Sequence, residues 1–264
     1  MDDTAQQLLA CYDTGQQIAP LSDSIPGFDA AAAYRLSAGL TRLRRARGEQ
    51  PTGRKIGFTN RTIWPLYGVD GPMWGWMYDT TLHELPADGR ISLPTWPEPR
   101  IEPEIAFHFA RSPSPGMSVA DIAACIDWVA HGVEIVISPY PGWRFTAADS
   151  IAAFGLHGGF WYGPPVAAAT LLADGPGALE TFGLTLTGPG ETHQGHARDV
   201  LDGPLHALRF LLDEIAQMPD APPIQPGEVV TTGTLTDARP IAPGQTWKTR
   251  FQGLALPGLQ IKFT

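Results

Sequence analysis

Two glutamates within one short apolar segment are the first residues in this chain that point to chemistry. In residues 100–109 every odd position except Pro103 is apolar, and Glu102 and Glu104 stand at even positions. Because side chains alternate along a strand, the pattern predicts a strand over 101–109 with both carboxylates on one face, about 7 Å apart at Cα. Like charges this close repel, so a bound cation explains them better than a solvated polar face. Pro103 removes a backbone donor and favours a sheet edge or a bulge.

A third glutamate stands alone in the otherwise apolar run GVEIVI, residues 132–137. A buried, ionised Glu134 is costly unless it meets a cation, strong hydrogen-bond donors or a proton. One interpretation is a metal ion shared with the first pair, and the other is an ion pair with an arginine such as Arg144. Three carboxylate ligands suit Mg²⁺ or Mn²⁺ and leave positions for water and substrate, whereas no thiol is placed to favour zinc.

The elements that must position these residues change character along the chain. Up to about residue 47 the spacing of apolar residues is helical, and from residue 55 onward glycines and prolines separate short apolar runs that favour strands. We therefore expect a helical N-terminal segment over 1–50 and a β-rich catalytic core over 51–264 that act as one functional unit. The pattern predicts strands at 101–109, 132–138, 182–188, 228–233, 246–252 and 259–263, and helices at 118–129 and 203–218.

Composition excludes several classes of function. The 264 residues carry a net charge of −9 and no basic run longer than Arg44-Arg45, which argues against a nucleic-acid partner. The most apolar stretch, 151–173, is interrupted by a histidine, glycines and prolines and is not expected to span a membrane. The acidic start lacks the features of a signal peptide, and two distant cysteines imply no disulfide framework. We expect a cytoplasmic protein.

The order of several short motifs resembles the 2-oxopent-4-enoate hydratase and 4-oxalocrotonate decarboxylase branch of the fumarylacetoacetate hydrolase superfamily. The likeness runs from about residue 5 to the C-terminus, and the combined order is more specific than any one motif. The matching motifs are GRKIGFT at 53–59, YGVD at 67–70, GWMYD at 75–79, PRIEPEIA at 99–106, VEIV at 133–136, GPLHAL at 203–208 and GEVVTTGTLT at 227–236.

The resemblance implies a fold and a metal site. The fold is the α+β class, with a fumarylacetoacetate-hydrolase-like mixed β-sheet roll as core behind a helical N-terminal segment. Glu102, Glu104 and Glu134 match the family's ligands for Mg²⁺ or Mn²⁺. The partner is a small-molecule 2-oxo acid, and the resemblance also suggests a homo-oligomer.

The resemblance also assigns roles around the metal. Lys55 matches the active-site lysine, available to a substrate carboxylate or an enolate, although a packed surface lysine fits its sequence as well. Asp79 matches the catalytic acid, and the aromatic residues before it are expected to form a loop that dries the site and raises its pKa; an ordinary turn aspartate is the alternative. Thr234 and Thr236 are candidates to bind substrate oxygens, or ordinary hairpin-edge threonines.

The chain departs from the family at two places. An acidic residue usual three positions after the third ligand is Ile137 here, and the usual Asp-Asn pair is Ala153-Phe154. His157 is new at its position and is either an acid or base, or a buried structural histidine. The main prediction is that the protein is a lyase that hydrates a 2-hydroxy-2,4-dienoate to a 4-hydroxy-2-oxo acid in aromatic catabolism. Decarboxylation of an oxalocrotonate-type acid, C–C hydrolysis of an acylpyruvate, and a non-catalytic relative that only binds remain the alternatives.

Overall fold

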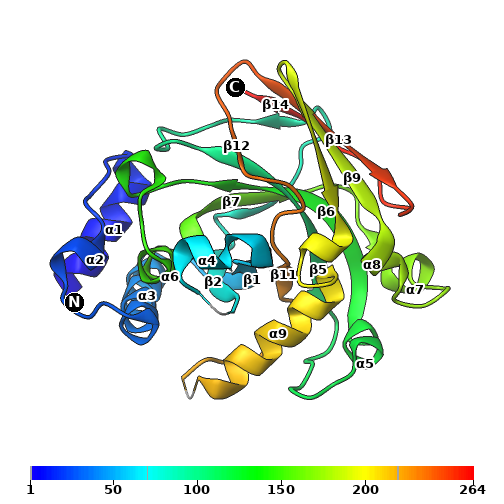
Figure 1. The fold of residues 1–264 in the computed structure, drawn as a ribbon, viewed down its shortest axis with the longest axis horizontal. Helices are drawn as coiled ribbons and strands as arrows, with labels where there is room; N and C mark the ends of the chain where they lie inside the picture. Colours follow the sequence, from blue (N-terminus) through cyan, green and yellow to red (C-terminus); the bar gives the residue numbers. More distant parts are fainter. Residues whose placement is uncertain (1, 70, 219) are drawn as a thin grey trace.

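Two curved β-sheets form the centre of the molecule in the computed structural model, which describes residues 2–69, 71–218 and 220–264. Figure 1 shows the helices α1 to α3 at one side and the strands β9, β13 and β14 at the other. In the described residues the larger sheet has nine strands in the order β2-β1-β11-β5-β6-β7-β3, with β12 on β5 and β8 on β6. The smaller has the order β10-β9-β13-β14-β4. Asp70, the last residue of the YGVD motif, lies outside the described residues.

The strands carry most of the chain after the N-terminal helices. They are β1 (Pro51–Gly57), β2 (Met73–Tyr78), β3 (Leu82–Glu84), β4 (Arg90–Ile91), β5 (Arg100–Phe109), β6 (Ile126–Val136), β7 (His157–Tyr162), β8 (Val166–Ala167), β9 (Gly183–Gly188), β10 (Glu191–His196), β11 (Val229–Thr231), β12 (Arg239–Pro240), β13 (Thr246–Gln252) and β14 (Gln260–Phe263).

Most of the helices are short. They are α1 (Asp2–Thr14), α2 (Leu21–Ser24), α3 (Ala30–Ala46), α4 (Trp64–Tyr67), α5 (Val119–Ala123), α6 (Ala147–Ala152), α7 (Ala168–Leu171), α8 (Ala178–Thr181) and α9 (Pro204–Gln217), with 3₁₀ turns at Arg61–Ile63, Pro141–Trp143, Phe154–Leu156 and Ala197–Asp199. No described helix is both long and apolar enough to cross a membrane.

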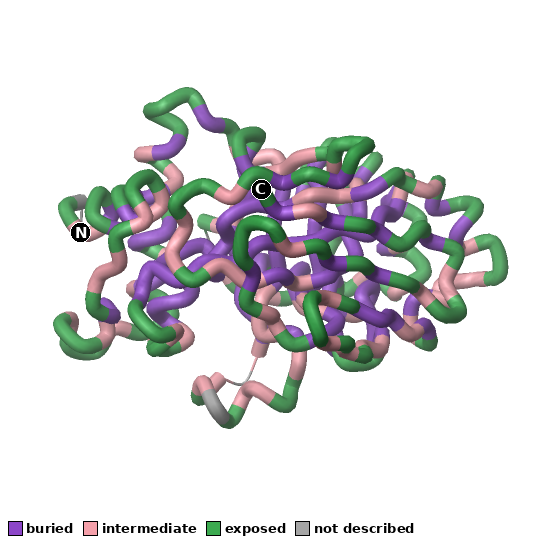
Figure 2. Tube along the Cα trace, turned by 90° about the horizontal axis from the view of Figure 1, so that it is seen from above, coloured by how far each residue is buried: buried purple, intermediate pink, exposed green. Residues whose placement is uncertain are grey.

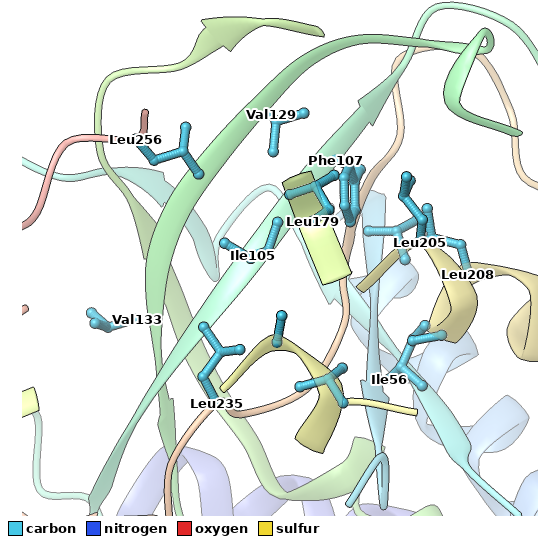
Figure 3. Close-up of a cluster of buried hydrophobic side chains, with 14 of the residues drawn as sticks. Ile56, Ile105, Phe107, Val129, Val133, Leu179, Leu205, Leu208, Leu235 and Leu256 are labelled. Atoms are coloured by element: carbon cyan, nitrogen blue, oxygen red, sulfur yellow. The ribbon is translucent and has the colours of Figure 1, made fainter. Parts of the chain in front are cut away.

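The main apolar core lies on the face of β5 opposite the glutamates. Ile105 and Phe107 of β5 and Val133 of β6 are fully buried there, and Leu205 and Leu208 of α9 belong to the same cluster (Figure 3). The tube view shows the same buried centre beneath an exposed surface (Figure 2). The alternation predicted from the sequence is therefore confirmed, because the core fixes which face of β5 the carboxylates must take.

The N-terminal segment is helical, as the sequence predicts. Leu8 of α1 and Leu36 and Leu40 of α3 pack with α6 in a second core. The chain changes from helix to strand between the end of α3 and the start of β1. The division of the chain into two parts at residue 50 stays a prediction.

Three local expectations were wrong. The helix over 118–129 ends at Ala123, because the residues from Ile126 onward pair with β5 along its whole length. The aromatic segment 74–78 is not a loop but part of β2, paired with β1. Pro103 is not at a sheet edge, because β5 lies between β11 and β6 inside the sheet. Regular pairing with β11 ends at Thr231, before it reaches Pro103, so no paired strand there needs the backbone N–H that proline lacks.

Candidate metal centre

Three carboxylates from β5 and β6 meet at one point. Glu102 and Glu134 are directly paired in the antiparallel ladder, and Glu104 is two residues further along the same face. One oxygen from each glutamate lies within 4.8 Å of the others. Glu104 and Glu134 are fully buried, and Glu102 is half-buried at the wall of a cavity. The strands thus bring together the three side chains that the sequence singled out.

Lys55 reaches this cluster from β1, across the intervening strand β11. Its Nζ lies 3.1 Å from Oε2 of Glu134 and donates a hydrogen bond of 2.9 Å to the carbonyl of Gly155. The lysine is buried, so the alternative of a surface lysine is wrong. The proposed arginine partner of Glu134 is also wrong, because Arg144 pairs at the surface with Asp23.

His157, the first residue of β7, holds the other oxygen of Glu134. Its Nδ1 lies 2.7 Å from Oε1 of Glu134, and its Nε2 lies 2.9 Å from Oγ1 of Thr81. All three side chains are buried. The histidine therefore fixes the orientation of the carboxylate from behind, as ligand-supporting residues do in metal sites.

One oxygen of Glu104 has no partner. Its Oε2 accepts a hydrogen bond of 3.0 Å from the backbone N of Gly233. Its Oε1 is buried and makes no hydrogen bond to the described residues, although the hydroxyl of Thr231 lies near this carboxylate. The approach of this loop requires glycine, since a Cβ there would lie 2.0 Å from Oγ1 of Thr59. Buried polar atoms without partners are rare, and a cation at the shared point would satisfy this one. The residues present therefore fit a hard divalent ion.

The pKa values show how unequally the charges are balanced. Burial raises the pKa of Glu102 to about 7 and that of Glu104 well above its usual range, in spite of the nearby lysine. Burial also disfavours the charge of Glu134, but Lys55 and His157 outweigh it and lower its pKa. Burial opposes the charge of Lys55 as well, yet the three glutamates raise its pKa. One ammonium thus faces three carboxylates, which leaves room for a second cation.

A cavity of about 380 Å³ opens beside the carboxylates. Phe58, Tyr67 and Phe145 form a continuous aromatic wall, with ring centroids 5.1 and 5.4 Å apart and the last two stacked. Such a volume and such a wall suit a small flat molecule. Other lining residues are Lys55, Asn60, Arg100, Glu102, Trp143, Gly155, Thr234, Thr236 and Arg239.

Asp79 does not reach this site. Lys55 pairs with Gly75, whereas Asp79 follows Tyr78 at the other end of β2, about 13 Å away along the strand. Its carboxylate is exposed and accepts a hydrogen bond of 3.0 Å from the backbone N of Gln50. The expected dry environment is therefore wrong, and the turn aspartate is the correct alternative.

The two candidate threonines do line the cavity. Oγ1 of Thr234 donates a hydrogen bond of 2.6 Å to the carbonyl of Thr236, and Oγ1 of Thr236 donates to the carbonyl of Asp237. These bonds shape their own turn. Their role toward a substrate stays a prediction.

Several groups in the site have no signal in the amino-acid sequence. Phe154, Gly155 and Leu156 all have positive φ, of 51°, 66° and 64°, a strained run for two bulky residues. This turn presents the carbonyl that receives the Lys55 bond. Thr81 carries no sequence signal either. A position for Arg100 in the site, in contrast, could have been predicted from the sequence, because Arg100 lies two residues before Glu102 and shares its face of the strand.

The chain is similar to known enzymes over nearly its whole length, although no family model matches it. It is 28% identical over 264 residues to the 2-hydroxyhexa-2,4-dienoate hydratase of Comamonas testosteroni, covering 97% of this chain and 95% of that protein. It is 30% identical over 254 residues to the 2-keto-4-pentenoate hydratase of Burkholderia vietnamiensis, covering 95% and 93%.

Solved structures give the same picture. The 4-oxalocrotonate decarboxylase of Pseudomonas putida, complexed with magnesium and adipate, superposes with a TM-score of 0.89 at 25% identity over 100% of this chain and 97% of that one. The fumarylpyruvate hydrolase of Pseudomonas aeruginosa shares the fold, with a TM-score of 0.57 at 12% identity over 80% of this chain and 88% of that one. The expected fumarylacetoacetate-hydrolase-like α+β fold is confirmed.

Proposed function

Because the chain belongs to the 2-keto-4-pentenoate hydratase and 4-oxalocrotonate decarboxylase family of the fumarylacetoacetate hydrolase superfamily, we propose that it hydrates a 2-hydroxy-2,4-dienoate to a 4-hydroxy-2-oxo acid. The chain is a lyase that depends on a divalent metal. Relatives at 28 to 30% identity over nearly the whole chain bear hydratase names, which favours hydration over decarboxylation. Decarboxylase relatives at 28% identity keep that reaction as the second candidate.

The observation that carries the proposal is the unpartnered oxygen of Glu104 at the point where Glu102 and Glu134 converge. These three carboxylates would hold Mg²⁺ or Mn²⁺. Structures of the decarboxylase carry magnesium with adipate and calcium with acetate, and the fumarylpyruvate hydrolase carries Mn²⁺ with pyruvate. When bound, such an ion supplies a Lewis acid that stabilises enolate-like charge on a 2-oxo acid.

The side chains of this chain supply binding and proton transfer. The ammonium of Lys55 lines the cavity and stabilises negative charge that develops on the substrate, and it is positioned to move a proton during ketonisation. The aromatic wall of Phe58, Tyr67 and Phe145 stacks on the flat conjugated chain and excludes bulk water. Thr234 and Thr236 lie where their turn can contact substrate oxygens.

His157 acts through Glu134 in this proposal. It contacts a carboxylate and a threonine but does not line the cavity among the described residues, so it is a positioning residue and not the acid or base considered from the sequence. Asp79 has no part in the proposed reaction. We also propose a cytoplasmic homo-oligomer with neither nucleic acid nor membrane as partner, in keeping with two buried free thiols.

An absorbance assay tests the proposed reaction. A panel of 2-hydroxy-2,4-dienoates should lose the dienol chromophore with the enzyme, and product analysis should show a 4-hydroxy-2-oxo acid. Chelation should abolish turnover, and Mg²⁺ or Mn²⁺ should restore it. Release of CO₂ from an oxalocrotonate-type acid, or cleavage of an acylpyruvate, would replace hydration by one of the alternative reactions. Binding of 2-oxo acids without any turnover would identify a non-catalytic relative.

A further inference from the structure

The cavity beside the glutamates has two chemically different ends. Along β5 the side chains on the cavity face change from fully buried Glu104 to half-buried Glu102 and then to half-buried Arg100. Residues two apart share a face and lie about 7 Å apart at Cα. The closed end is therefore the carboxylate cluster, and a guanidinium stands at the open end.

Arg100 has no carboxylate within ion-pair distance among the described residues, unlike the arginines near it. Arg144 pairs with Asp23 at 2.6 Å, and Arg239 pairs with Glu191 at 2.7 Å. The acidic residue that precedes Arg100 is occupied elsewhere: Oε1 of Glu98 accepts from the side chain of Gln17 and from the backbone of residue 142, each at 2.9 Å. Arg100 therefore makes no ion pair among the described residues, although the charges of Glu98 and Glu102 lie close enough to act on it.

An aromatic ring fixes the orientation of this guanidinium. Its central carbon lies 3.9 Å from the centroid of Trp143, which also lines the cavity. A cation–π contact uses the flat face of the guanidinium and leaves its N–H groups at the edge free. Those edges form the fork that binds a carboxylate through two parallel hydrogen bonds. In a chain with a net charge of −9, a dianionic ligand requires such a local cation.

We propose that Arg100 binds a second carboxylate at the far end of the substrate and selects dicarboxylic 2-oxo or 2-hydroxydienoic acids over monocarboxylic ones. This inference rests on the proposed function, because it requires the first carboxylate and the 2-oxo group to lie at the glutamate end. The substrate then runs along the aromatic wall, and its second carboxylate meets Arg100. An extended six-carbon chain spans about the 7 Å between two residues on one face of a strand.

Two non-reacting ligands of equal length test the inference directly. 2-Oxoadipate and 2-oxohexanoate share the 2-oxo acid head and differ only in the distal carboxylate. Titration calorimetry of the full chain loaded with Mg²⁺ should show that 2-oxoadipate binds about 10- to 100-fold more tightly, the range of a charge-assisted bidentate contact. R100Q should remove this preference and leave 2-oxohexanoate binding within about threefold.

Two further variants separate recognition from general charge or folding effects. R144Q removes a positive charge next to Trp143 that is already paired at the surface, and it should keep the full preference. R100K keeps the positive charge but lacks the planar fork of the guanidinium, so it should keep part of the preference for 2-oxoadipate. The Tm of each variant reports folding independently of binding.

Three results would overturn the inference. Equal affinity of the wild-type protein for both ligands would show that the distal carboxylate is not recognised. An equal loss of affinity for both ligands in R100Q and R100K would show that Arg100 binds the first carboxylate or only supports the fold. If the metal-loaded protein binds neither ligand, the proposed function fails and the inference fails with it. The first two results leave the proposed function standing.

Discussion

Glu102 and Glu134 face each other as a directly paired position of the ladder between β5 and β6. Two carboxylates opposite each other repel, and burial increases the cost. Lys55 lies 3.1 Å from Glu134 and offsets one charge, while Glu104 adds another carboxylate. The cluster is therefore stable with all its carboxylates charged only when an additional cation is bound.

Loss of any one carboxylate should disable the centre. Glu102→Gln, Glu104→Gln and Glu134→Gln keep the shape of the side chain but remove a ligand charge, so turnover should fall by at least about 100-fold and Mg²⁺ affinity should fall with it. Steady-state kinetics and calorimetry measure both. Asp79→Asn is the matched control, since its carboxylate is exposed at the far end of β2, and it should keep wild-type turnover. A large loss of turnover in this control would show that Asp79 takes part in the reaction.

Lys55 should be separable from metal binding. Lys55→Met removes a cation from beside three carboxylates, so the affinity for Mg²⁺ should stay equal or increase because one competing positive charge is gone. Turnover should nevertheless fall by at least about 100-fold, since the charge on the reacting substrate loses its partner. Calorimetry and kinetics on the same preparation make the comparison. Parallel loss of metal binding and turnover would reduce Lys55 to a structural support of Glu134.

The histidine behind Glu134 should act on geometry. His157→Ala should weaken Mg²⁺ binding by about 10- to 100-fold, as removal of a ligand-supporting residue does. His157→Asn, which offers Glu134 a hydrogen bond of similar position, should recover part of that affinity. The shape of the pH–rate profile should be the same in all three proteins. Disappearance of one limb of the profile in His157→Ala would instead make the histidine an acid or base.

The metal-free protein should lose stability as pH rises through the window set by Glu102. Its pKa is about 7 in the folded state against 4.5 as the ordinary value, because burial disfavours the charge. Between these values the folded state holds a proton that the unfolded state has released, so the free energy of unfolding falls with increasing pH. Glu104 shifts in the same direction, and the lowered pKa of Glu134 acts only below the window. The lowered pKa values of buried His131 and His157 act in the opposite direction below about pH 6.5, because the unfolded state binds protons there that the folded state does not. The decline is therefore expected above about pH 6.5.

Thermal unfolding in the presence of a chelator measures this slope. Tm should decline from about pH 6.5 to about pH 8, and Mg²⁺ should raise Tm more at the upper end, because the ion binds the deprotonated carboxylates. Glu102→Gln should flatten the decline. A Tm that rises across the window in the metal-free protein would contradict the assigned pKa direction.

The sequence was informative where periodicity and burial act together. Period-two alternation in β5 placed Glu102 and Glu104 on one face, and the apolar run of β6 marked Glu134 as a residue in need of a partner. The role of Lys55 came from the family resemblance, since its own neighbours in the sequence fit a surface lysine equally well.

What the sequence could not provide depends on contacts between distant segments. The placement of His157 behind Glu134 depends on the pairing of β6 with β7. Thr81 directly precedes β3 and reaches the site because β3 pairs with β7. Asp79 was misplaced because the residues before it extend as a strand paired with β1. Backbone groups such as the carbonyl of Gly155 have no signal in residue type at all.

The most direct test of the metal centre is a crystal soaked in Mn²⁺ and measured at the manganese absorption edge. We expect one strong anomalous peak about 2.2 Å from oxygens of Glu102, Glu104 and Glu134, with Oε1 of Glu104 among the ligands. Absence of a peak at saturating Mn²⁺, or a peak bound only elsewhere on the chain while turnover still requires the ion, would contradict the account.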